Sequence, residues 1–240
     1  DLLVEAMMKE GLTQEQAVDR IFLFDSHGLV TKDREGLTPL KQKFAHEQEP
    51  QSTFLDAIGE VKPTAIVGRA AQAGSFNAYV LSAMARINER PIIFALSNPT
   101  SRSECTAREA YTYTEGKCLF ASGSPFPQVE VNGKTFIPRQ SNNSYVFPGI
   151  GLGLVVSSPR IVPQSVFLSA AEALSKIVSE DDLENGSLFP SLTKIREVSQ
   201  SIAAAVAEQC FTAGVAGVPK PDDLSKAIQE AMYKPVYDRI

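Results

Sequence analysis

The chain has 240 residues, of which 43% are hydrophobic and 21% are charged, as in ordinary globular proteins with a sizeable core. Its formal net charge of −5 is spread over both signs without long blocks, so we expect no nucleic-acid partner. The longest apolar runs are too short to span a bilayer, so we expect no membrane partner either. Three scattered cysteines are too few for a disulfide framework or a thiolate metal site. We therefore expect an intracellular, reducing compartment, with cytosol, plastid and mitochondrial matrix left open.

The first 25 residues predict two short helices and one strand. Apolar residues of DLLVEAMM recur at helical spacing before Gly11, and Thr13 with Gln16 forms a capping-box pattern for a second helix. The apolar run IFLFD (21–25) ends in an acid and a turn, which predicts a buried parallel strand. Because the chain opens directly on a helix, without an initiator methionine or a signal sequence, we interpret it as the C-terminal part of a longer protein.

Short apolar strands then alternate with helices up to residue 124. The predicted strands cover 64–68, 91–97 and 118–124, and the helices cover 54–61, 76–87 and 106–111. This alternation is typical of crossover units in a parallel sheet. The predicted fold class is therefore α/β, a Rossmann-like, mostly parallel sheet without its first strand and glycine loop, followed by a C-terminal helical segment.

The pattern changes after residue 127. Alternating apolar residues around Asn132-Gly133 predict a hairpin with a type I′ turn. Amphipathic helices are predicted over 165–178 and 193–211, and a proline-containing tail is expected to be extended. We predict three segments, namely a truncated Rossmann-like domain, a helical segment and an extended tail, over 1–142, 143–214 and 215–240.

Two glycine-containing stretches are candidates for a phosphate-binding loop. The glycines of GIGLGL (149–154) follow a loop and not an obvious strand, so we favour close helix packing over a pyrophosphate site. VGRAAQAGSF (67–76) leaves a predicted strand and enters a predicted helix, so its backbone N–H groups could face a ligand. A tight strand-to-helix turn explains the second stretch equally well, and both interpretations stay open.

Polar side chains near the predicted strand ends are candidate ligand contacts. Asp25 stands where a dinucleotide-binding unit places the acid that binds the adenosine ribose, although it could simply cap a turn with Ser26. Lys41 lies in a basic loop nearby, and a cation there would favour NADP over NAD, although surface lysines are usually just solvated. Asn98 precedes Pro99 at a strand end and could donate to a carboxylate or a carboxamide; from spacing alone an Asx turn is slightly favoured.

Three motifs in order resemble the C-terminal half of malic enzyme, namely FALSNPTSRSECTAREAY (94–111), FASGSPF (120–126) and NNSYVFPGIGLG (142–153). The resemblance covers essentially the whole chain, and the closing residues are most similar to the NADP-dependent enzymes of plants and algae. It implies oxidative decarboxylation of L-malate to pyruvate and CO2, with reduction of NADP (NAD being possible) and with Mg²⁺ or Mn²⁺.

The resemblance also implies roles for three asparagines. Asn98 and Asn143 match the asparagines that contact malate, and we expect Asn98 to contact the cofactor as well. Asn142 matches the asparagine on the nicotinamide side. The motif departs from the family pattern at Arg139 and Ser141, where the family keeps glycine or another small residue, so Arg139 could perturb the loop or reach a carboxylate.

Further matched positions concern the adenosine end of the cofactor. Asp25 matches the ribose-binding acid, and Ser26 with Lys41 matches positions associated with a preference for NADP. A second cofactor-contacting loop is matched by Gly68, Arg69 and Ala70.

By the same resemblance, the catalytic tyrosine and lysine and the acidic metal ligands lie upstream of residue 1. We therefore predict no catalytic residue and no metal ligand in this chain, and no turnover of malate by the isolated 240 residues. The resemblance further implies a homo-oligomer, dimer or tetramer, at full length. Two alternatives stay open, namely a non-catalytic dinucleotide-binding or assembly module and a different dehydrogenase of 2-hydroxy acids.

Overall fold

The computed structural model of the protein describes residues 1–234 and divides into two compact units. The first unit comprises residues 1–141 and 180–189, and the second comprises 142–179 and the described residues from 190 onward. Residues 180–189, which the sequence analysis placed with the helical segment, thus belong to the first unit.

The first unit is built on a four-stranded sheet in the order β3-β4-β5-β8, with every neighbouring pair parallel. The strands are β3 (Ala65–Gly68), β4 (Ile92–Ala95), β5 (Leu119–Ser122) and β8 (Arg139–Gln140). The predicted α/β, mostly parallel architecture is confirmed. Strand β8 was not expected, because a two-residue polar segment carries no strand pattern.

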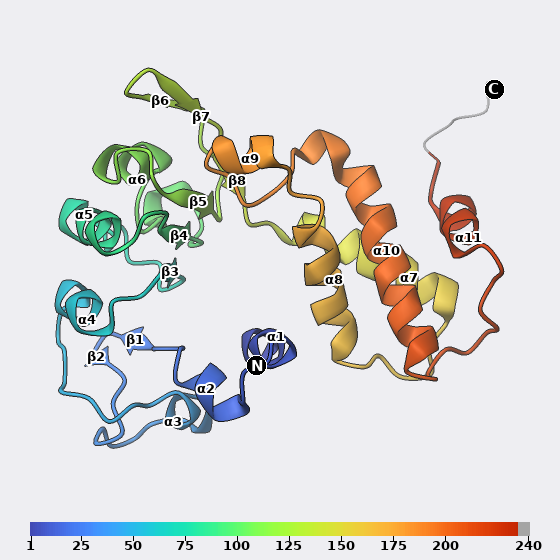
Figure 1. Cartoon of the computed structure of the whole chain (residues 1–240), viewed down its shortest axis with the longest axis horizontal. Coiled ribbons are helices and arrows are strands. Elements are labelled where there is room, and N and C mark those ends of the chain that lie inside the picture. Colours follow the sequence, from blue (N-terminus) through green and yellow to red (C-terminus); the bar gives the residue numbers. More distant parts are fainter. Residues whose placement is uncertain (235–240) are drawn as a thin grey trace. The chain divides into compact units, whose positions relative to one another are not determined.

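Helices α4, α5 and α6 line one side of this sheet (Figure 1). They cover Phe54–Val61, Ala78–Ile87 and Ala107–Tyr113, and each begins at a side-chain N-cap, in order Thr53, Asn77 and Thr106. The caps fix where each helix begins by accepting hydrogen bonds from otherwise unpaired backbone N–H groups. Inward side chains of these helices and strands form one buried core, with members including Ile58, Leu81, Met84, Ile93, Tyr111 and Phe120.

The N-terminal part of the first unit has a small core of its own. Helices α1 (Leu2–Lys9) and α2 (Gln14–Val18) are as predicted, with the capping box of Thr13 and Gln16 present. Helix α3 (Pro39–Lys43) was not predicted, although its Thr38 N-cap and proline at the first position are a recognised start signal.

The prediction of a buried parallel strand over 21–25 is wrong. Only β1 (Phe24–Asp25) is a strand, and it pairs antiparallel with β2 (Gly28–Leu29) in a separate two-stranded ladder. The chain turns back at Ser26 and His27, Gly28 follows with a φ of +97°, and Val30 N–H donates to the Leu23 carbonyl at 2.8 Å. The apolar run therefore satisfies its backbone locally in a hairpin and stays half-buried.

The predicted hairpin is present as β6 (Val129–Val131) and β7 (Lys134–Phe136). Asn132 and Gly133 at its turn have φ values of +53° and +75°, the pair of left-handed residues that a type I′ turn requires.

Helix α9 (Glu180–Glu184) and the residues after it complete the first unit from a distant part of the chain. The Gly186 carbonyl accepts from Phe120 N–H of β5 at 2.9 Å, and the Asn185 carbonyl accepts from Ile137 N–H at 3.3 Å. Gly186 also lies against the rings of Tyr111 and Phe136. The residues that follow α9 are therefore hydrogen-bonded into the first unit.

The second unit is helical. It contains α7 (Phe147–Ser157), α8 (Ser165–Ser175), α10 (Ile195–Thr212) and α11 (Leu224–Ala231). Short 3₁₀ turns cover Thr100–Arg102 in the first unit, and Asn143–Tyr145 and Leu192–Lys194 in the second. Within residues 1–234, none of the helices combines the length and the apolar character that crossing a bilayer would take.

The glycines of α7 pack against α10, as the sequence analysis favoured. A Cβ on Gly149 would lie 2.6 Å from Ile202 Cβ, and one on Gly153 would lie 2.7 Å from the Ala203 carbonyl oxygen. The glycines let the two helix backbones come this close, so they do not form a phosphate loop.

The prediction of an extended tail from residue 215 is wrong for α11. Asp223 caps this helix by accepting from Lys226 N–H at 2.9 Å, and Ile228 is buried within the second unit. A polar cap at its start and an apolar anchor in its last turn thus hold this helix in the second unit. The last part of the predicted tail, 235–240, lies outside the described residues.

Candidate functional site

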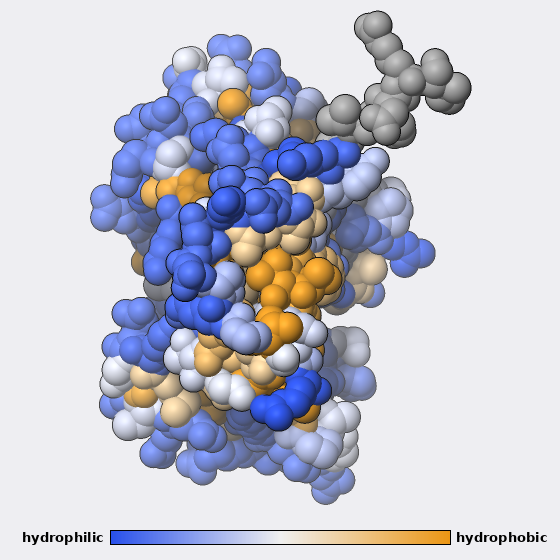
Figure 2. Space-filling view, turned by 90° about the vertical axis from the view of Figure 1, so that its right-hand side faces the viewer, coloured by the Kyte–Doolittle hydropathy of each residue, from blue (hydrophilic) through white to orange (hydrophobic). Residues whose placement is uncertain are grey.

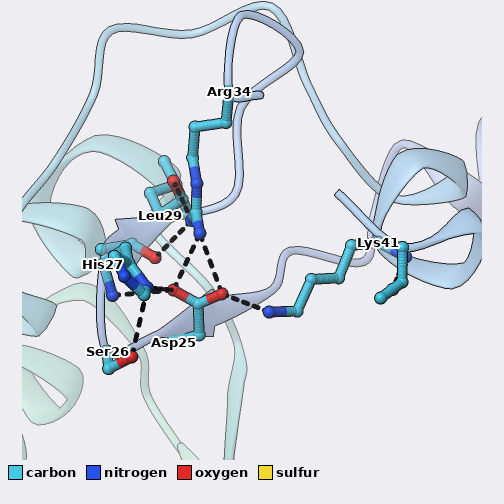
Figure 3. A network of polar contacts seen from close by, with 8 residues as sticks. Asp25, Ser26, His27, Leu29, Arg34 and Lys41 are labelled. Carbon is cyan, nitrogen blue, oxygen red and sulfur yellow. Dashed lines mark hydrogen bonds and ion pairs between the residues drawn. The ribbon is translucent and has the colours of Figure 1, made fainter. Parts of the chain in front are cut away.

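A network of polar contacts surrounds Asp25 at the end of β1 (Figure 3). Arg34 Nη2 donates to both carboxylate oxygens, at 3.1 and 3.0 Å, and Lys41 Nζ donates to Oδ2 at 2.5 Å. The backbone N–H of His27 donates to Oδ1 at 2.8 Å. Arg34 also donates to the carbonyls of Gly28 and Leu29, so it ties the carboxylate to the β1–β2 hairpin.

The charges of this network favour an anionic ligand. Burial alone raises the pKa of Asp25, but the hydrogen bonds from Lys41, Arg34 and the His27 backbone outweigh it and hold the pKa well below its usual range. The carboxylate is therefore ionised at neutral pH. Two cations against one carboxylate leave one net positive charge, and the Lys41 side chain is 38% exposed. Such a site can accept a phosphate at its open side.

Ser26 stands beside this network. Its hydroxyl lies 3.2 Å from Nδ1 of His27, and both side chains are exposed. The structure therefore places the three predicted residues Asp25, Ser26 and Lys41 around one site. Arg34 was not among the predicted site residues, although its position in the same basic loop was a signal for it.

The predicted residues Gly68, Arg69 and Ala70 lie at the end of β3, where Gly68 is the last residue of the strand and the other two begin the loop. Arg69 and Ala70 are exposed, and helix α5 does not begin until Ala78, so this segment is a loop and not a direct strand-to-helix turn. Three backbone N–H groups fix the loop to the segment after β4. Ala71 N–H donates to Ser97 Oγ at 2.9 Å, and Gly74 and Phe76 donate to the carbonyls of residues 103 and 104, at 3.4 and 3.0 Å.

Asn98 is exposed beyond the carboxyl end of β4. Its Oδ1 accepts a hydrogen bond from the Ser124 hydroxyl at 2.7 Å, so the bond runs to the loop after β5 and is not an Asx turn. This bond fixes the orientation of the amide, whose N–H groups are the donors that Asn98 can offer to a ligand.

The FASGSPF motif braces this edge of the sheet. The Ser122 hydroxyl donates to the Ser124 carbonyl at 2.7 Å, and Gln140 Nε2 donates to the Gly123 carbonyl at 3.0 Å. Gly123 has no room for a side chain, because a Cβ would collide with the Leu96 carbonyl. The small residues of the motif therefore let the loops after β4 and β5 meet and hold Asn98 in place.

Asn142 and Asn143 open the second unit, whereas Asn98 belongs to the first. Asn142 Oδ1 accepts from Ser144 N–H at 2.9 Å and caps the 3₁₀ turn, and both asparagine side chains are exposed. Arg139 lies in β8, where its backbone pairs with Ala121 in the sheet. Its Nε is buried with no hydrogen-bond partner among residues 1–234.

No metal-binding cluster is found in the described part of the chain. Within residues 1–234 there is no group of three or more histidine, cysteine, aspartate or glutamate side chains that could hold a metal ion. The three cysteines are all free and buried.

Comparisons with known proteins give the relatives of this chain. The family model described as "Malic enzyme, NAD binding domain" matches residues 1–211. The mitochondrial NAD-dependent malic enzyme of Ascaris suum is 45% identical, over 100% of this chain and 38% of its own length. The chloroplastic NADP-dependent malic enzyme of Zea mays is 48% identical, over 93% of this chain and 35% of its own length.

A solved structure extends the agreement to the fold. The malic enzyme of Entamoeba histolytica superimposes with a TM-score of 0.69 at 22% identity, over 95% of this chain and 45% of that one. The chain thus spans less than half the length of the relatives that it matches. From the family model and the identities together, we conclude that the chain belongs to the malic enzyme family, whose NAD-binding domain it contains.

Proposed function

We propose that this chain is the cofactor-binding part of an NADP-dependent malic enzyme, which oxidises L-malate and releases pyruvate and CO2. The observation that carries the NADP preference is the cluster of Asp25, Arg34 and Lys41, with its one net positive charge at an open side. NAD-dependent relatives are similarly close, so the charge of this cluster, and not the identity, supports the preference.

In this proposal the cluster binds the adenosine ribose, whose 2′ substituent distinguishes NADP from NAD. Lys41 and the Ser26 hydroxyl contact the 2′-phosphate of NADP, and Arg34 keeps Asp25 ionised and oriented. With NAD, the ribose 2′-hydroxyl donates to Asp25, as in other dinucleotide-binding units. The backbone of the loop from Gly68 to Ala70 lies against the cofactor.

The asparagines position the reacting groups. The amide N–H groups of Asn98 donate to malate or to the nicotinamide carboxamide, Asn143 contacts malate, and Asn142 faces the nicotinamide. Hydride transfer requires the malate C2–H and the nicotinamide C4 to be held about 3–3.5 Å apart, and neutral amides can fix both without adding charge. Residues 1–234 do not fit a site for Mg²⁺ or Mn²⁺, so we expect residues outside this chain to hold the metal.

We further propose that the full-length protein is an intracellular homo-oligomer. Large apolar side chains are exposed, among them Val155 at 72% and Ile161 at 66%, and Figure 2 shows hydrophobic surface gathered on one face of the molecule. Exposed apolar surface of this kind supports an assembly interface. The buried free cysteines support a reducing compartment.

The test is a comparison of cofactors in the full-length protein. We expect malate-dependent formation of NADPH and CO2, and tighter binding of NADP⁺ than of NAD⁺ by isothermal titration calorimetry. The isolated 240 residues should not turn over malate. Full-length protein that binds neither dinucleotide would refute the proposal, and one that binds dinucleotide without turnover would support a non-catalytic module. Malate oxidation without CO2 release would support a different 2-hydroxy-acid dehydrogenase.

A further inference from the structure

Glu104 is a buried carboxyl group to which the proposed function assigns no role. Its side chain is 1% exposed, and no cation of residues 1–234 forms an ion pair with it. Burying a carboxyl group without a cation is costly unless hydrogen bonds satisfy it. The groups that donate hydrogen bonds to Glu104 therefore show which part of the structure it stabilises.

Both oxygens of Glu104 accept hydrogen bonds from one residue, Ser97. The Ser97 hydroxyl donates to Oε1, and the Ser97 backbone N–H donates to Oε2 at 3.3 Å. A hydroxyl has one proton, so this bond leaves its lone pairs free to accept. One of them accepts the backbone N–H of Ala71 at 2.9 Å. The order of donation is therefore from Ala71 to Ser97 to Glu104.

Ala71 needs this support because its backbone is unfavourable. Its φ is +53°, in the left-handed region, where a residue with a Cβ is strained. The hydrogen bond to Ser97 holds Ala71 in that conformation directly after Arg69 and Ala70. The Glu104 carbonyl accepts from Phe76 N–H at 3.0 Å, so the same residue also fixes the far end of the loop.

Gly68 adds a steric link between Glu104 and the loop. A Cβ on Gly68 would collide with the Cγ and Cδ atoms of Glu104, so the carboxyl side chain fills the space directly beside the end of β3. The Glu104 side chain therefore explains why this position has a glycine, without the glycine pattern of a phosphate-binding loop.

We propose that Glu104 is a positioning residue, which acts through Ser97 to hold the loop from Gly68 to Ala71 in its cofactor-binding conformation. The inference rests on the proposed function of that loop. A carboxylate suits the position better than an amide, because Ser97 presents two donors and only a carboxylate has an acceptor on each oxygen. In a Glu104→Gln variant, one Ser97 donor would face an NH2 group.

The experiment measures steady-state kinetics and NADP⁺ binding in the full-length protein for Glu104→Gln, Ser97→Ala and Ser97→Thr. We expect Glu104→Gln and Ser97→Ala to raise both the KM and the Kd for NADP⁺ about tenfold, with kcat changed less than about twofold. Ser97→Thr keeps the hydroxyl and should restore the wild-type KM.

Ser103→Ala is the matched control. Ser103 and Ser97 are both 6% exposed, but the Ser103 hydroxyl donates to the Cys105 carbonyl at 2.8 Å and not toward the loop. We expect its KM for NADP⁺ to be unchanged. An equal rise of KM in Ser103→Ala, or an unchanged KM in Glu104→Gln, would overturn the proposed role.

Amide hydrogen exchange in the wild-type protein gives a second test, which does not require any variant to fold. The Ala71 N–H should exchange slowly in the wild-type protein, because it is hydrogen-bonded to a buried serine. Exchange as fast as in an open loop overturns the inference. Wild-type protein that binds neither dinucleotide refutes the proposed function together with the inference, whereas normal wild-type binding with unaffected variants overturns the inference alone.

Discussion

The glycines of α7 allow a test in which one substitution has opposite effects along a single helix. Gly149, Gly151 and Gly153 stand two residues apart along the helix, and we propose to replace each of them by alanine. A Cβ on Gly151 would meet no atom within 4 Å. On Gly149 it would lie 2.8 Å from the Ser199 carbonyl oxygen, and on Gly153 it would lie 2.8 Å from Val206 Cβ.

The expected sizes follow from two competing contributions. Glycine to alanine within a helix is intrinsically favourable by about 0.8–1 kcal/mol, so Gly151→Ala should stabilise the protein by about that amount. At Gly149 and Gly153 the added methyl group meets the backbone of α10, which cannot move aside as a flexible side chain can. Overpacking of this kind costs about 1–3 kcal/mol, so after the helix-propensity gain we expect a net loss of up to about 2 kcal/mol.

The assay is urea unfolding followed by circular dichroism, with the midpoint and the m-value compared between variants. Gly151→Ala should shift the midpoint upward and the other two variants should shift it downward, all at unchanged m. If all three variants shift the midpoint in the same direction, α7 and α10 are not packed as closely as described.

Lys41→Gln should weaken the binding of NADP⁺ far more than that of NAD⁺, because a cation beside the ribose is lost. An unchanged ratio of the kcat/KM values for the two cofactors would show that Lys41 does not determine the preference. The pKa of Asp25 in the folded protein lies well below the ordinary aspartate value of about 4, so its ionised carboxylate stabilises the folded protein above about pH 4. This stabilisation is lost as the pH falls through the folded-state pKa. The stability difference between wild type and Asp25→Asn should therefore shrink below about pH 4 in acid titrations, and a difference that is constant with pH would contradict this reasoning. Ser124→Ala should release Asn98 and lower kcat/KM about tenfold, and unchanged kcat/KM would show that the 2.7 Å bond does not orient the amide. Burial raises the pKa of Cys118 to about 12, so iodoacetamide at pH 8 should modify it only after unfolding, as mass spectrometry can verify.

Much of the first unit could be predicted because its strands and helices carry local signals. Each of β3, β4 and β5 is a short apolar run, and helix α6 begins at a capping box of Thr106 and Glu109. The segment 21–25 has the same apolar pattern, but pairing depends on partners elsewhere in the chain, and this run folds back on itself. Strand β8 shows the reverse case, since only its neighbour β5 makes two polar residues a strand.

The candidate site was predictable to the extent that it depends on residue type at a strand end. Asp25 and Lys41 could be named in advance, but their direct pairing and the role of Arg34 depend on how the loop between them folds. Glu104 could not be found at all, because SRSEC looks like an exposed polar loop and charged residues are rarely buried completely.

The return of residues 180–189 to the first unit has a consequence for synthesis on the ribosome. The chain crosses between the units after residues 141, 179 and 189, so the first unit is not one continuous stretch. Phe120 N–H lacks the Gly186 carbonyl as its partner until that glycine has emerged, by which time α7 and α8 have already been made. The first unit therefore cannot complete its fold before α7 and α8 of the second unit have been synthesised. All of its segments are present once residue 189 has been made, while α10 and α11 of the second unit are still to follow.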